Sequence, residues 1–149
     1  MVAHSAVQVQ IVPWGSQRYI QSLGLRFEVL RRPLGMVFDP AVFLDEVNDV
    51  HLVALHNDWV LGCMILSRAV DGVKMRQVAV EQREQRLGVG SEMVRFAEQY
   101  AKEMGYKAIL LHARDSAVPF YLKHDYELVG DGFLEVGIPH HAMRKSFVD

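Results

Sequence analysis

The chain has 149 residues, of which 50% are hydrophobic and 23% charged, as expected of one soluble globular domain with a sizeable core. Its 16 basic and 18 acidic residues give a formal charge of −2, which argues against a generic nucleic-acid or membrane-surface binder because both need a concentrated positive field. The single cysteine, Cys63, excludes an internal disulfide and a thiolate zinc site, and its apolar neighbours predict a small buried hydrophobe.

The chain shows no targeting or linker segment. Polar residues at positions 4, 5, 8 and 10 interrupt the apolar stretch that an export signal needs, and no segment is long and apolar enough to span a bilayer. A free thiol fits a reducing compartment, and neither repeats nor low-complexity tracts divide the chain. We therefore expect residues 1–149 to form a single cytoplasmic domain.

Hydrophobic periodicity in the first third predicts a strand and then a helix. Apolar residues alternate with glutamines over residues 7–11, which is the period of a half-buried strand. Between Gly15 and Pro33, apolar residues follow a three-then-four spacing typical of one helix face. A second, short helix is expected around residues 42–47. The expected buried face of the first helix consists of Ile20, Leu23, Phe27 and Leu30.

Three extended segments follow in quick succession, at residues 51–56, 59–68 and 73–80. The pairs Asn57-Asp58 and Asp71-Gly72 separate them, and such pairs favour hairpin turns, so the three strands should be antiparallel neighbours.

The last third returns to helical periodicity and then closes the sheet. An apolar stripe from position 93 to 104, with Gly105 as its C-terminal cap, predicts a long helix. Residues 107–111 form a buried strand and residues 116–123 a short helix in this interpretation. Closing strands are expected at residues 126–129 and 142–147. The strand–helix–strand order predicts a parallel fourth and fifth strand.

The most informative segment is VAVEQREQRLGVGS, residues 78–91, which leads from a strand into the long helix. Gly88 and Gly90 lie at the junction, where the first amides of a helix are free to bind a phosphate or pyrophosphate. Arg83 and Arg86 are placed to add charge-assisted hydrogen bonds, although the glycines alone are also explained by a tight turn. A P-loop would need a lysine after Gly90, and a dinucleotide fingerprint would need a third glycine, so both nucleotide motifs fit poorly.

Two motifs resemble the signatures of the GNAT superfamily of acyl-CoA-dependent N-acetyltransferases. One is Gln-x-x-Gly-x-Gly, at Gln85, Gly88 and Gly90; the other is VPFYLKHDY at residues 118–126. The resemblance extends over residues 75–147 and points to a small, single-domain bacterial type. Asp115 and Asp125 depart from the family pattern, which commonly has Asn and Gly at these places.

The resemblance implies an α/β (α+β) GNAT fold. Its central sheet would be mixed and mostly antiparallel, with six to seven strands, about four flanking helices, and a parallel fourth and fifth strand that splay apart. Acetyl-CoA would be the co-substrate, with its pyrophosphate on the glycine turn and its pantetheine arm on the free edge of the fourth strand. The residues implied to bind it are Val78, Ala79, Val80, Gln85, Arg86, Leu87, Gly88, Val89, Gly90 and Ser91.

Catalysis needs an acid for the thiolate and a base for the ammonium. Tyr121 matches the family's general acid, and its alternative role is that of a core aromatic. His112 and Glu135 are candidates for the base or for contacts to the acceptor, although a water chain could also remove the proton. The stretch at residues 133–140 resembles one found in a bacterial subgroup of small GNAT proteins.

The acceptor site is expected to involve Arg26 and Glu28 on the first helix, together with His140; a solvated helix face is the alternative for the first two. The acidic run Asp45, Glu46 and Asp49 is read as a solvated loop that is also able to attract a cation. No metal site is expected, because adjacent histidines point apart in a strand and no histidine pair has a helical i, i+4 spacing.

The leading hypothesis is an N-acetyltransferase that acts by direct transfer to a primary amine in a ternary complex. The alternative is a non-catalytic acyl-CoA binding or sensing module. Polyamines, amino sugars, amino acids, antibiotics and peptide amines all remain compatible as acceptors, since acceptor loops vary on one scaffold. Neither nucleic acid nor a membrane is an expected partner, and a homodimer is the expected assembly.

Overall fold

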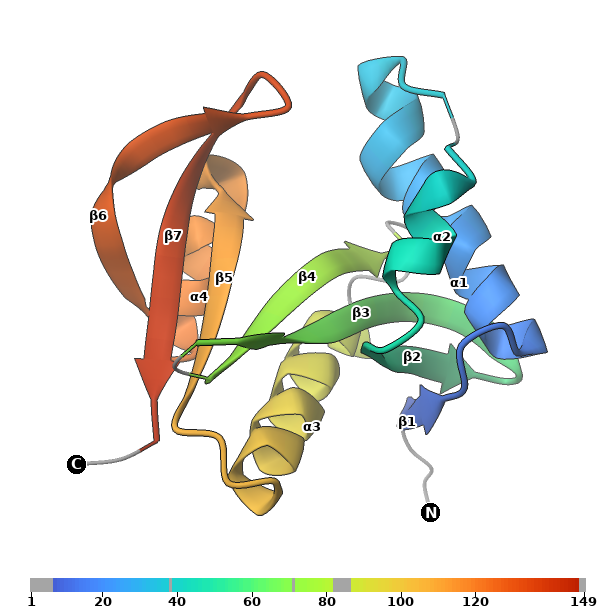
Figure 1. Cartoon of the computed structure of the whole chain (residues 1–149), viewed down its shortest axis with the longest axis horizontal. Coiled ribbons are helices and arrows are strands. Elements are labelled where there is room, and N and C mark those ends of the chain that lie inside the picture. The colour runs from blue at the N-terminus through green and yellow to red at the C-terminus, as the bar shows by residue number, and fades with distance from the viewer. Residues whose placement is uncertain (1–6, 38, 71, 82–86, 148–149) are drawn as a thin grey trace.

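The computed structural model describes residues 7–37, 39–70, 72–81 and 87–147, and these form one sheet flanked by helices on both faces (Figure 1). Seven strands of the described chain pair in the order β1-β2-β3-β4-β5-β7-β6. The elements are β1 (Gln8–Val12), α1 (Gln17–Arg26), the π-helical turn η1 (Phe27–Arg31), the 3-10 turn η2 (Arg32–Leu34), α2 (Ala41–Asp45), β2 (Val50–His56), β3 (Trp59–Ala69), β4 (Gly72–Val80), α3 (Val89–Glu103), β5 (Ala108–Arg114), the 3-10 turn η4 (Asp115–Ala117), α4 (Val118–Lys123), β6 (Glu127–Glu135) and β7 (Ile138–Ser146).

The sheet is mixed, as predicted. Only β4 and β5 pair in parallel, and the other five neighbouring pairs of described strands are antiparallel. In Figure 1, α1 and α2 lie on one face, while α3 and α4 cover the other. The longest described helix is α3, with 15 residues, and none of the described helices combines the length and apolar character of a membrane span.

Local turn chemistry explains several element boundaries. Asn57 and Asp58 both have positive φ, at 50° and 66°, which matches the tight hairpin turn predicted between β2 and β3. Asp125 has φ of 69°, so it occupies the left-handed conformation at the position where the family that the two motifs resemble commonly has glycine. The other predicted hairpin turn includes Asp71, which lies outside the described residues.

The predicted buried face of α1 was wrong in part. Ile20 is 60% exposed, whereas the neighbouring Tyr19 and the polar Ser22 and Arg26 are buried against the sheet. Apolar periodicity does not reveal this face, because Ser22 and Arg26 are polar. Both are buried with hydrogen-bond partners, the carbonyl of Tyr19 and the carboxylate of Glu46. In addition, α1 continues into the π-helical turn η1, which changes the period.

The C-terminal hairpin is longer than predicted. Residues 133–140 lie between the closing strands predicted at 126–129 and 142–147, yet they belong to the paired part of β6 and β7, where Val136 and Gly137 make the turn with φ of 46° and 77°. Because β5 also extends to Arg114, His112 lies within a strand with a fixed neighbour on β7.

Candidate active site

The strands β4 and β5 separate soon after they meet. They pair over three positions only, from Val73 opposite Ile109 to Met75 opposite Leu111. Beyond this point β4 continues to pair with β3, and β5 with β7, so the facing edges of residues 76–80 and 112–114 have no strand partner in the described sheet. Figure 1 shows the two strands diverging. The divergence leaves free backbone groups on which an extended ligand can pair.

A β-bulge in β4 lies directly beside this divergence. Two residues of β4, Gln77 and Val78, lie opposite the single residue Met64 of β3. The backbone of Gln77 has a positive φ of 53°. Bulges of this kind bend a strand and change the direction of its side chains. Arg31 of η1 stabilises the bulge, because its Nη2 donates to Oε1 of Gln77 at 2.9 Å.

Tyr121 lies at the closed end of the divergence. Its side chain extends from α4 into the core. The Tyr121 hydroxyl is 4.0 Å from Sδ of Met75, the last residue of β4 that pairs with β5. Burial raises the pKa of Tyr121 to about 12, so the phenol stays protonated at neutral pH. The position therefore suits both the core role and the proton-donor role that the sequence suggests.

The N-terminus of α3 lies near the end of β4, and its first amides have no acceptor within the helix itself. Gly88 is the N-cap, with φ of 70° and no side-chain cap, and the first helical bond runs from the amide of Glu92 to the carbonyl of Gly88 at 3.0 Å. The amides of Val89, Gly90 and Ser91 thus have no partner within the helix. Among the other predicted acetyl-CoA contacts, Leu87 is partly exposed, and Gln85 and Arg86 lie outside the described residues, as does Arg83.

The second glycine of the turn has a packing role that the sequence did not reveal. A Cβ at Gly90 would lie 3.3 Å from Cζ of Phe120, so the absence of a side chain lets α3 approach α4. Ser91 is also tied to α4, because its hydroxyl lies 3.0 Å from Nε2 of His124. The glycine turn and the helix that carries Tyr121 are therefore packed as one unit.

Three of the predicted residues gather on the β5–β7–β6 sheet. Nδ1 of His112 lies 2.9 Å from Oε1 of Glu135, and Nε2 of His140 lies 3.6 Å from its Oε2. Phe133 packs edge-on against the His112 ring at 5.0 Å and stacks on the His140 ring. Partial burial opposes ionisation of Glu135, but the hydrogen bond and charge of His112, with the charges of His140 and Lys74, lower its pKa overall. Glu135 is therefore a carboxylate at neutral pH.

The strand register shows which face this cluster occupies. Along β5, Ile109, Leu111 and Ala113 belong to the core under α3, so His112 points to the opposite face. Arg114 shares the face of His112 and reaches Leu30 of η1, which places this face on the side of α1. In the described part of the chain, no three His, Cys, Asp or Glu side chains gather into a group able to hold a metal.

Arg26 and Glu28 do not contact this cluster. Arg26 is buried and forms two hydrogen bonds to Glu46, at 2.8 and 2.6 Å, and Tyr19 donates to the same carboxylate at 2.9 Å. The prediction of a solvated loop was thus wrong for Glu46, which is 1% exposed. Glu28 is exposed and pairs with Arg32 at 3.2 Å.

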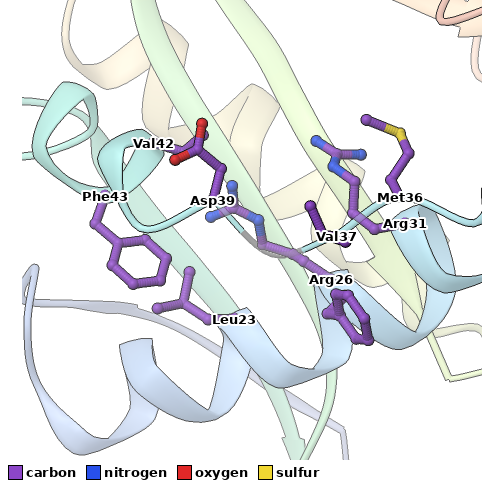
Figure 2. Close-up of a pocket in the computed structure, with 9 residues that line it drawn as sticks. Leu23, Arg26, Arg31, Met36, Val37, Asp39, Val42 and Phe43 are labelled. Carbon is purple, nitrogen blue, oxygen red and sulfur yellow. The ribbon is translucent and has the colours of Figure 1, made fainter.

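Arg26 also borders a cavity of about 220 Å³ between α1–η1 and the segment that leads into α2 (Figure 2). Figure 2 shows Arg31 on the same wall, beside Met36, with Asp39 across from Arg26. No signal in the sequence singles out Arg31, Gln77 or Arg114. Arg31 and Gln77 are 46 positions apart in the chain, and Arg114 is 84 positions from Leu30, so their contacts appear only in the folded structure.

Comparison with known proteins agrees with this geometry. A family model described as an acetyltransferase (GNAT) domain matches residues 40–147. An uncharacterized N-acetyltransferase of Bacillus subtilis, YjcF, is 36% identical over 81 residues, which is 53% of this chain and 58% of that protein. The match thus spans less than two thirds of the relative's length.

Solved structures share the fold over nearly the whole chain. An acyl-CoA N-acyltransferase from Pseudomonas aeruginosa has a TM-score of 0.79 at 20% identity and covers 95% of this chain and 100% of its own. A GNAT family acetyltransferase from Elizabethkingia anophelis, solved with acetyl-CoA bound, has a TM-score of 0.74 at 13% identity and covers 97% of this chain and 100% of its own.

Proposed function

Because the chain belongs to the GNAT acetyltransferase family, we propose that it moves the acetyl group of acetyl-CoA to a primary amine, by direct transfer while both substrates are bound. The observation that carries the proposal is the separation of β4 from β5 immediately after Met75, with the Tyr121 hydroxyl at that point. A relative in fold has been solved with acetyl-CoA bound, which supports the same co-substrate here.

The free edge of β4 and the N-terminus of α3 suit two parts of acetyl-CoA. The pantetheine arm is extended and peptide-like, so it pairs with the edge of residues 78–80 as an added strand would. The pyrophosphate is an anion, and the unpaired amides of residues 89–91 carry the positive end of the α3 dipole. The packing of Gly90 on Phe120 keeps this anion site in register with α4 and Tyr121.

Transfer breaks one bond and forms another. The neutral amine nitrogen attacks the thioester carbonyl carbon, and the C–S bond breaks as the C–N bond is completed. The leaving sulfur receives the proton of the Tyr121 hydroxyl, which burial keeps protonated until that step. The attacking nitrogen, positively charged once the C–N bond has formed, releases one proton to solvent, and solvent returns a proton to the Tyr121 phenolate.

The ammonium of the acceptor, with an ordinary pKa of about 10, must first lose a proton. We assign this proton to Nε2 of His112. Nδ1 of His112 is engaged by the Glu135 carboxylate at 2.9 Å, which fixes the tautomer and orients the ring. Nε2 of His140 lies 3.6 Å from Oε2 of Glu135, which is beyond hydrogen-bond distance, and its Nδ1 donates to the carbonyl of Ile138 at 2.7 Å.

The test is Tyr121→Phe, with thiol release from acetyl-CoA measured across a panel of amines. We expect kcat to fall about 100-fold while the affinity for acetyl-CoA is retained, because only the acid is removed. Tyr100→Phe, a half-buried tyrosine on α3, is the control and should keep its rate.

Two results would contradict the proposal. A Tyr121→Phe variant as fast as the parent would remove Tyr121 from the acid role. A parent protein that binds acetyl-CoA tightly while no amine raises thiol release would favour the alternative, a non-catalytic acyl-CoA binding module.

A further inference from the structure

The π-helical turn η1 spans the divergence of β4 and β5. From η1, Arg31 donates to Gln77 at the bulge of β4, and the carbonyl of Leu30 faces Nη2 of Arg114 on β5 at 3.5 Å. Arg31 and Arg114 therefore lie on either side of the gap between the two strands. Both are half-buried, and both are on the face that carries His112.

Neither guanidinium has a carboxylate partner. Within residues 7–37, 39–70, 72–81 and 87–147, no Asp or Glu oxygen forms an ion pair with Arg31 or Arg114. Their hydrogen bonds go to a neutral amide and, at the long distance of 3.5 Å, to a backbone carbonyl. Burial and the positive charges of Arg26 and Arg114 lower the pKa of Arg31 overall, although the charge of Glu46, which is itself paired with Arg26, acts in the opposite direction.

Neighbouring arginines behave differently. Arg26 is neutralised by Glu46, and Arg32, next to Arg31 in the chain, pairs with Glu28. Two half-buried guanidinium groups that lack an ion-pair partner destabilise the folded state. Such a pair beside a reaction site indicates that a bound ligand supplies the anion.

We propose that Arg31 and Arg114 bind a carboxylate of the acceptor, so that the substrate is an amine that carries a carboxylate, as amino acids do. This inference rests on the proposed function, since it names the substrate class of the same site. His112 and Arg114 are alternate residues on one face of β5, a spacing of about 7 Å, which places the proton acceptor and the anion site within reach of one small molecule. A singly charged carboxylate also suits the site better than a phosphate, because Glu135 lies beside His112.

The experiment compares matched acceptors. Thiol release from acetyl-CoA is measured with amino acids, with the carboxamides of the same amino acids, with spermidine and with O-phosphoethanolamine. We expect kcat/KM for the acids to exceed that for the carboxamides by about tenfold or more.

Arg31→Gln and Arg114→Gln should each raise KM for the acids, and the double variant should abolish the preference, with KM for acetyl-CoA unchanged. Arg32→Gln removes the same charge one residue away and should retain the preference.

A second measurement does not depend on turnover. Calorimetry on the CoA-saturated protein compares N-acetyl amino acids with their carboxamides, and thermal unfolding checks that each variant is folded.

Equal use of acids, carboxamides and spermidine would overturn the inference and leave the proposed function standing. A preference for O-phosphoethanolamine would overturn the carboxylate assignment, and a raised KM for acetyl-CoA in the variants would assign the arginines to that substrate. Binding of the N-acetyl amino acids without any turnover would support the inference and contradict the proposed function.

Discussion

Two carboxylates in this molecule contact nitrogen-bearing side chains, one pair in the interior and the other in a partly exposed position. The Arg26–Glu46 pair joins α1 to the end of α2 with side chains 8% and 1% exposed, whereas His112 and Glu135 meet across β5 and β6 with side chains 35% and 46% exposed. The first pair is joined by two hydrogen bonds inside the protein, and Arg26 borders the cavity beside α2 while its charge is neutralised by Glu46. The second keeps one ring nitrogen of His112 and part of a carboxylate open to the gap beside β5. A carboxylate held by a nitrogen donor therefore stabilises the fold in one region, whereas the partly exposed pair in the other region is the one to which we assign proton transfer.

The largest expected effect is at the buried pair. Arg26→Ala should lower the free energy of unfolding by about 3–5 kcal/mol, because it leaves the Glu46 carboxylate buried without its counterion. Urea denaturation measures this loss, and Arg32→Ala at an exposed pair is the matched control. A loss below about 1 kcal/mol would contradict the structural role and would make Arg26 available as an acceptor contact.

The same pair predicts how stability depends on pH. Burial opposes ionisation of Glu46, but the hydrogen bond and charge of Arg26, with the hydrogen bond of Tyr19, lower its pKa below the ordinary 4.5. The contribution of this group is therefore fully present above about pH 4.5 and is lost as the pH falls through the lowered value. Unfolding measured between pH 7 and pH 3 should show this loss in the parent, and Glu46→Gln should not show it.

At the open pair we expect a loss of activity rather than of stability. Glu135→Gln should reduce kcat/KM by about tenfold to a hundredfold, because His112 loses the carboxylate that fixes its tautomer and orients its ring. Steady-state kinetics and thermal unfolding on one preparation separate the two effects. Glu127→Gln, an exposed carboxylate on the same strand, is the control. If Glu135→Gln changed the melting temperature and not the rate, the open pair would be structural, like the buried one.

The smallest effect is expected at a third, still more exposed pair. Arg32 and Glu28 have side chains 67% and 57% exposed, and such pairs contribute little because water screens them. Glu28→Gln should change the free energy of unfolding by no more than about 0.5 kcal/mol and should leave the rate unchanged. A rise in the acceptor KM instead would support the sequence-based assignment of Glu28 to the acceptor site.

The elements themselves were largely predictable, because their signals are local. Alternation and turn pairs such as Asn57-Asp58 predicted β2 and β3, and the change to helical periodicity predicted α3. The two motifs predicted the family, which the family model confirms, and with it the mixed sheet and its parallel fourth and fifth strands. The roles of Tyr121, His112 and Glu135 stay predictions that the variants above test.

The sequence by itself determined which segments are strands and helices, and where a glycine turn and a tyrosine-bearing helix follow one another. Only the tertiary structure decided which polar residues meet. It buried Glu46 against Arg26, put the bulge at Gln77 under Arg31, and brought Arg114 of β5 to η1. The physical reason is that periodicity reports how one element divides its own residues between inside and outside, whereas these contacts join residues 20, 46 and 84 positions apart, whose meeting depends on how strands and helices pack.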